Sequence, residues 1–166
     1  MKNNYLLLLL CNLVCFYGAA NSISTKQNSK ILIEQAYVRA TIPGTSISSS
    51  YMDIVNNGNE SITLLSVSSD ISPRIEIHQH TMLDGMMRMR KLDLIDIKSK
   101  DRIKLQPSGL HLMLFDVKKP LNDQEHIELT LHFSKKKPIT VQVPVYSPVQ
   151  EKTVQKMSSI MHKHHH

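Results

Sequence analysis

HIELTLHF, at residues 126–133, alternates polar and apolar side chains without interruption. Successive side chains of an extended strand point to opposite faces, so the isoleucine, both leucines and the phenylalanine would share one face. The sequence therefore predicts a β-strand with one buried face. His126 and His132 fall on the polar face and are expected to meet solvent rather than a metal ion.

Similar short runs lie on both sides of this stretch. Strands are expected at residues 31–40, 48–55, 61–68, 74–82, 86–97, 102–105, 110–117 and 139–145. Turn-forming residues separate many of them, as at Pro43-Gly44, Asn56-Asn57-Gly58, Asp84-Gly85, Pro107-Ser108-Gly109 and Asn122-Asp123. No segment shows a helical period over three turns. This spacing predicts an all-β fold, an antiparallel sandwich or barrel over residues 30–146.

The N-terminus has the layout of a secretory signal peptide. Lys2 precedes an apolar run at residues 5–16, and Gly18-Ala19-Ala20 offers a cleavage site. The run is shorter than the roughly 20 residues that span a bilayer, although retention as an anchor is the alternative. We expect a signal peptide at 1–20, export and no stable membrane insertion after cleavage. Residues 21–29 are expected to be a flexible lead-in and 147–166 a flexible tail containing His and Met.

Both cysteines, Cys11 and Cys15, lie in the expected leader. They follow Leu10 and Val14, whereas a lipoprotein acceptor cysteine follows a small residue, so lipidation fits poorly. Cleavage would leave a chain without disulfides or thiolates, which excludes thiol oxidoreductase chemistry and a blue-copper centre.

The chain is basic, with 20 Lys and Arg against 14 Asp and Glu. Part of this excess lies at residues 135–137 and in the tail, where solvated side chains are expected. Aromatic residues are few and no glycine-rich phosphate loop is present, so nucleic acid is not an expected partner. Histidine and methionine are prominent instead, with nine of each.

Asp84-Gly85 predicts a two-residue type I′ turn between two strands. In that register Met82 faces Met87 and His80 faces Met89, with His78 diagonal to Met89. Residues directly opposite share a face of an antiparallel pair. One face of the hairpin would therefore present five side chains, those of His78, His80, Met82, Met87 and Met89.

A second group of the same kind occurs in GLHLMLF at residues 109–115. His111, Met113 and Phe115 would share one face of a strand, with three leucines on the other. Imidazole and soft, neutral thioether suit Cu(I), and a thioether cannot be lost to a disulfide. Zinc prefers Cys, His or carboxylate. The alternative for each residue alone is that the methionine fills the core and the histidine is hydrogen-bonded.

The order His78, ten residues, Met89, twenty-one residues and His111-Leu112-Met113 resembles the H-x10-M-x21-H-x-M pattern of the periplasmic copper chaperones called PCuAC. Further similar segments are Ala36–Ala40, Tyr51–Ile54, Asn57-Gly58, Glu76–His78, Asp84–Arg90, Leu105–Gly109, Leu112–Leu114, Pro120-Leu121 and Val143–Val145. The resemblance extends over residues 35–145.

The resemblance implies a cupredoxin-like, Greek-key β-sandwich that is not an enzyme. It implies one Cu(I), held near the surface by His78, Met89, His111 and Met113. It also implies delivery by ligand exchange to the binuclear copper centre of cytochrome c oxidase, alone or beside an Sco-type protein. The alternatives are a copper-buffering or resistance protein of the same fold, and a β-sandwich interaction module without metal.

Two features go beyond the family pattern. His80 would lie nearer Met89 than His78 does, and it could be an alternate ligand, a group that supports a ligand, or an exposed residue. Met87 is a further candidate ligand. The tail could hold a second copper, as in family members with His- and Met-containing tails, or be the remnant of a purification tag. Its candidate ligands are His162, His164, His165 and His166.

Overall fold

The computed structural model describes residues 30–83 and 85–163. The expected signal peptide at 1–20 and lead-in at 21–29 lie outside the described residues, as do Asp84 of the predicted turn and His164–His166. The side chain of His162 is also outside them. No helix in the described part of the chain has both the length and the apolarity needed to cross a membrane.

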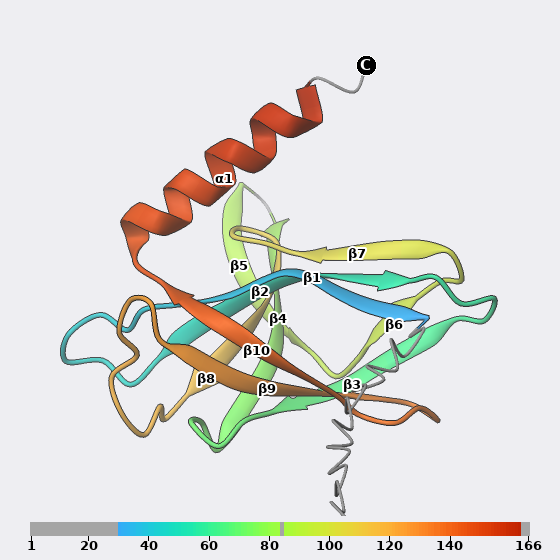
Figure 1. The fold of residues 1–166 in the computed structure, drawn as a ribbon, viewed down its shortest axis with the longest axis horizontal. Coiled ribbons are helices and arrows are strands. Elements are labelled where there is room, and N and C mark those ends of the chain that lie inside the picture. The colour runs from blue at the N-terminus through green and yellow to red at the C-terminus, as the bar shows by residue number, and fades with distance from the viewer. Residues whose placement is uncertain (1–29, 84, 164–166) are drawn as a thin grey trace, which may run out of the picture.

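The described residues form ten strands and one helix (Figure 1). These are β1 (Ile31–Arg39), β2 (Ser48–Asn56), β3 (Ile62–Ser68), β4 (Arg74–Leu83), β5 (Met86–Leu92), β6 (Ile95–Ile97), β7 (Asp101–Leu105), β8 (Leu110–Phe115), β9 (His126–Phe133), β10 (Ile139–Tyr146) and α1 (Pro148–Lys163).

The strands are hydrogen-bonded in the order β5-β4-β8-β7-β2-β1-β10-β9-β3-β6. Most neighbours are antiparallel, and the parallel pair of β1 with β10 connects the two layers. β2 pairs with β8 near its start and with β7 over its second half. The predicted all-β antiparallel sandwich is confirmed.

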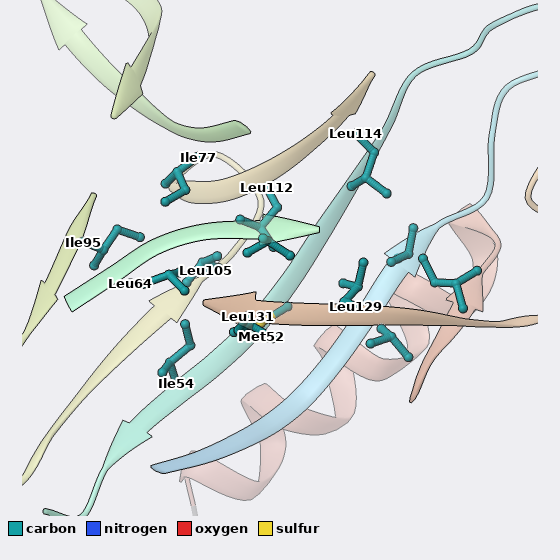
Figure 2. Packing of buried hydrophobic residues seen from close by; sticks show 14 of the residues in the cluster. Met52, Ile54, Leu64, Ile77, Ile95, Leu105, Leu112, Leu114, Leu129 and Leu131 are labelled. Carbon is teal, nitrogen blue, oxygen red and sulfur yellow. The ribbon is translucent and has the colours of Figure 1, made fainter. Parts of the chain in front are cut away.

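The core lies between the layers (Figure 2). On β9 the predicted alternation is confirmed, with Leu129 and Leu131 at 0% exposure. From the other layer Met52, Ile54 and Leu112 face them (Figure 2). Burying each large apolar side chain stabilises the fold by about 1.5–3 kcal/mol. This packing fixes which face of β4 and β8 is turned outward.

The single strand expected at residues 86–97 is wrong, because it is interrupted at Asp93 and Leu94. β5 ends at Leu92 after pairing with β4, whereas β6 begins at Ile95 and pairs with β3. Both intervening residues are exposed. The chain leaves one layer for the other here, and the strand is interrupted where it does so.

Within the stretch expected to be a flexible tail from residue 147 onward, residues 148–163 form α1. The backbone N–H of Gln150 donates to the hydroxyl of Ser147 at 3.4 Å, and Pro148 occupies the first helical position. Glu151 is buried and accepts hydrogen bonds from Arg39 at 2.6 and 2.8 Å and from Tyr37 at 3.1 Å. These contacts hold the first turn, and the rest of α1 extends away from the strands (Figure 1).

Candidate metal centre

Three adjacent strands bring the predicted ligands to one face. β4 lies between β5 and β8, and His78 is directly opposite His111 on β8. His80 is opposite Met89 on β5, which confirms the register expected from the Asp84-Gly85 turn. Met113 lies two residues beyond His111 on the same face of β8.

The site is shallow. The ring centroids of His111 and His80 are 4.9 Å apart, and those of His111 and His78 are 6.0 Å apart. His111 is only 3% exposed, whereas Met89 is 48% exposed. His78, His80 and Met113 are half-buried. The imidazole of His111 thus lies at the base of the group and the thioether of Met89 at its rim.

Two ring nitrogens of this group are unpartnered. Nδ1 of His78 and Nδ1 of His80 are buried and have no hydrogen-bond partner. Leaving a buried polar atom unsatisfied costs about 1–3 kcal/mol, which a bound metal ion would relieve. The arrangement therefore fits a metal ion that accepts imidazole nitrogen.

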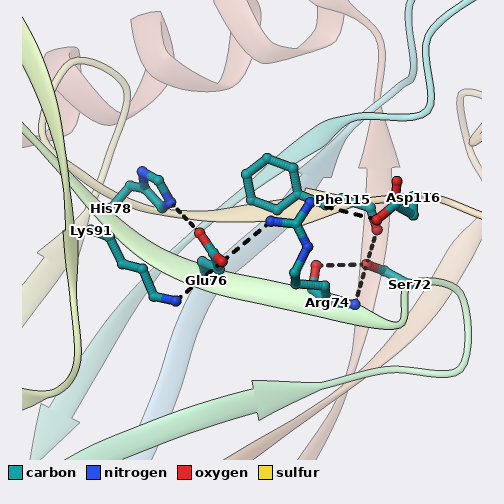
Figure 3. A network of polar contacts seen from close by, with 7 residues as sticks. All are labelled: Ser72, Arg74, Glu76, His78, Lys91, Phe115 and Asp116. Carbon is teal, nitrogen blue, oxygen red and sulfur yellow. Dashed lines mark hydrogen bonds and ion pairs between the residues drawn. The ribbon is translucent and has the colours of Figure 1, made fainter.

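The other nitrogen of His78 is held by Glu76. Nε2 lies 2.9 Å from Oε2 of the carboxylate. Lys91 and Arg74 donate to Oε1 of Glu76 at 3.2 and 3.3 Å (Figure 3). The hydrogen bond from His78, followed by that from Lys91, lowers the pKa of Glu76 to about 2. The carboxylate is therefore ionised at neutral pH and accepts a hydrogen bond from the Nε2–H group of His78. Nδ1 of His78 then carries the lone pair that is available to a metal ion.

On His111 the nitrogen available to a metal ion is Nε2, whereas on His78 it is Nδ1. Nδ1 of His111 donates to the backbone carbonyl of Gly109 at 3.1 Å, which leaves Nε2 as the available lone pair. Burial lowers the pKa of His111, partly offset by this hydrogen bond. At neutral pH the ring is therefore neutral, as metal binding requires.

Met113 is positioned by the neighbouring strand β2. Ser49 lies opposite it and its hydroxyl donates to the thioether sulfur at 3.6 Å. Across the other strand boundary, Glu76 is the residue opposite Met113. The hydrogen bond from Ser49 restricts where the sulfur lies.

The donor set determines the kind of metal. Within the described residues, no group of three or more His, Cys, Asp or Glu side chains is placed to hold a metal ion. The side chains on this face that could bind a metal ion include imidazoles and the thioethers of Met89 and Met113. That mixed neutral set suits Cu(I) rather than zinc or a hard cation.

Three contributors were not predicted from the sequence. Glu76 was recognisable as a second-neighbour of His78 on the same strand face. Ser49 and the carbonyl of Gly109 depend on strand pairing and loop geometry that no local pattern shows. Of the additional candidates, Met87 is 60% exposed and lies toward the hairpin tip.

Residues 31–145 match the family described as "Putative lipoprotein LpqE-like". A protein of Leifsonia xyli subsp. xyli named "Putative lipoprotein Lxx21020" is 26% identical over 121 residues, 72% of each chain. An uncharacterised protein of Rickettsia prowazekii is 33% identical over 103 residues, which are 60% of this chain and 57% of that one.

Solved structures with the same cupredoxin-like architecture are also similar. The copper-bound PCuAC domain from PmoF2 is 27% identical with a TM-score of 0.62, covering 72% of this chain and 94% of that domain. The apo PCuAC domain from PmoF1 is 26% identical with a TM-score of 0.61, covering 72% of this chain and 95% of that domain. The Cu(I) form of DR1885 from Deinococcus radiodurans, at 24% identity and a TM-score of 0.59, shares the fold and covers 71% and 78%.

Proposed function

The chain belongs to the LpqE-like family, and we propose that it is a Cu(I)-binding chaperone. The observation that carries this proposal is the convergence of two imidazoles and two thioethers from β4, β5 and β8 on one face. Similarity to the copper-bound PCuAC domain from PmoF2 supports it.

Four side chains would hold the ion. His78 supplies Nδ1, because Glu76 occupies Nε2, and His111 supplies Nε2, because Gly109 occupies Nδ1. Met89 and Met113 supply thioether sulfur. Because all four donors are neutral, the ion would keep its charge and bind without releasing a proton from a sulfur ligand.

Release would proceed by ligand exchange at the rim. Met89 is the most exposed of the four ligands and lies on β5, the edge strand. An incoming donor from the acceptor would bind copper there as the Met89 thioether leaves. The copper is cargo, and no covalent bond of a substrate changes, so the chain would not act as an enzyme.

We place this function in the periplasm, after cleavage of residues 1–20. The lipoprotein names of the family and of the Leifsonia protein agree with export, although neither cysteine of this chain follows a small residue. The acceptor we propose is the copper-centre subunit of cytochrome c oxidase, or an Sco-type protein that serves it.

An anaerobic Cu(I) titration against a chromophoric chelator tests the binding. We expect one tight equivalent in the mature chain and an affinity at least about 100-fold lower in His111→Ala/Met113→Ala, since supporting groups alone are worth 10- to 100-fold. His126→Ala/Met86→Leu is the matched control, because neither residue lies on the site face. Equal binding by both double variants would overturn the site.

Transfer separates delivery from buffering. The loaded protein is mixed with the apo copper-centre domain of the oxidase, and the absorption of that centre is followed. Formation of the centre with this protein as the copper source supports the chaperone. A tight site that gives up no copper to that domain or to an Sco-type protein would identify a buffering protein instead.

A further inference from the structure

The β4–β5 hairpin extends past the strand beside it. β4 pairs with β8 only as far as Gln79, opposite Leu110, and a last backbone bond joins His80 to Gly109. Pairing of β4 with β5 continues to Leu83, opposite Met86. In the described part of the chain, the end of the hairpin is therefore a two-stranded ribbon at the edge of the sheet.

Four methionines of this ribbon are exposed: Met82 by 66%, Met86 by 55%, Met87 by 60% and Met89 by 48%. Met82 is directly opposite Met87, and Met89 is opposite His80. Met82, Met87 and Met89 therefore share the face of the copper site, and we name these three residues the methionine ladder. Met86 is turned to the other face.

The ladder offers only neutral sulfur. Along this face of the hairpin, the pair of Met82 and Met87 is followed by the pair of His80 and Met89. No charged residue of this face lies between the two pairs. Arg88 and Arg90 are on the opposite face, because they alternate with Met87 and Met89 along β5. His80 adds the buried Nδ1 atom that has no partner.

Packing does not account for the ladder. Methionine usually fills gaps in a core, and burying it would stabilise the fold, yet these three side chains are about half exposed or more. Adjacent thioethers that need no deprotonation are, however, suited to Cu(I). A site with only a few neutral donors also binds the ion weakly enough to release it.

We propose that the methionine ladder is a second, weaker Cu(I) site, through which copper enters and leaves the site of His78 and His111. The inference rests on the proposed function. Copper held by Met82 and Met87 would form a new bond to Met89 or to Nδ1 of His80 as one Cu–S bond breaks. The copper remains Cu(I) throughout this exchange. Met89 is a ligand in both sites.

The test compares Met82→Leu/Met87→Leu with wild type, using the full mature chain and Cu(I). Leucine keeps the apolar volume and removes both sulfur atoms. Met86→Leu is the control, since it changes an equally exposed methionine of the same hairpin on the opposite face. Chelator competition measures the affinity of the first equivalent, stopped flow measures transfer to a small chelator, and methionine methyl NMR follows a second equivalent.

We expect transfer about tenfold slower in the double variant, with the first-equivalent affinity changed less than about twofold. In wild type the second equivalent should shift the methyl signals of Met82 and Met87, and Met86→Leu should behave as wild type. Unchanged transfer and unshifted methyls would overturn the ladder while leaving the first site intact. A large loss of first-equivalent affinity would make both residues ligands of that site and overturn a separate one. Failure of wild type to bind even one equivalent would instead overturn the proposed function.

Discussion

Nε2 of His78 lies 2.9 Å from the carboxylate of Glu76, while Nδ1 of the same ring is buried without a partner. Lys91 and Arg74 hold the carboxylate in place from two sides. One side of the imidazole is thus fixed by the protein and the other is available. Such carboxylate–histidine pairs set the tautomer and orientation of metal-binding imidazoles.

Glu76→Gln should therefore lower the Cu(I) affinity by about 10- to 100-fold without unfolding the domain. An amide can accept or donate, so it no longer specifies the Nε2–H tautomer of His78. Nitrogen-15 NMR of the apo protein reports the tautomer directly, and chelator competition gives the affinity. Glu128→Gln, an exposed change on β9, is the control. Wild-type affinity together with a wild-type tautomer in Glu76→Gln would refute the role.

His78 and His80 should differ in their importance for copper. The ring of His80 is nearer to His111, at 4.9 Å against 6.0 Å, but the structure shows a carboxylate partner for His78 and none for His80. We expect His78→Gln to reduce Cu(I) affinity at least about tenfold more than His80→Gln, since a supported ligand is the stronger one. The reverse order in chelator competition would make His80 the ligand.

Glu151 should anchor α1. Glu151→Ala removes two hydrogen bonds to Arg39 and one to Tyr37, so we expect the free energy of unfolding to fall by about 1–3 kcal/mol. Circular dichroism should also lose helical signal, and urea denaturation gives the stability. Lys152→Ala, an exposed change in the next position, should have little effect on either measure. An unchanged helical signal in Glu151→Ala would show that the helix needs no such anchor.

The terminal histidines should be separable from the Cu(I) site. Removing residues 164–166 should leave the tight Cu(I) equivalent unchanged and weaken binding of Cu(II), for which imidazole is a suitable ligand. Isothermal titration with each oxidation state distinguishes the two. If the tight Cu(I) equivalent disappears on truncation, the strands do not hold the copper.

Local patterns predicted the strands and the β4–β5 register well, because turn chemistry and two-residue alternation act over a few residues. Asp84-Gly85 alone indicated that His80 would face Met89. The start of α1 also had a readable signal that was missed. Ser147-Pro148 followed by Gln150 is a capping pattern.

Other features depend on residues far apart in sequence. The burial of Glu151 against Arg39, 112 residues away, has no local signature. The break between β5 and β6 arises because the two strands pair in different layers. The contact of Ser49 with Met113 likewise exists only once β2 lies beside β8. Sequence patterns therefore indicated the candidate ligands but not the groups that support them.

Copper K-edge X-ray absorption of the mature chain, loaded with one equivalent of Cu(I) under reducing conditions, tests the central claim most directly. The account predicts a mixed first shell of imidazole nitrogen and thioether sulfur, with the sulfur contribution diminished in Met113→Leu. A shell of nitrogen alone, or a spectrum that Met113→Leu leaves unchanged, would contradict it.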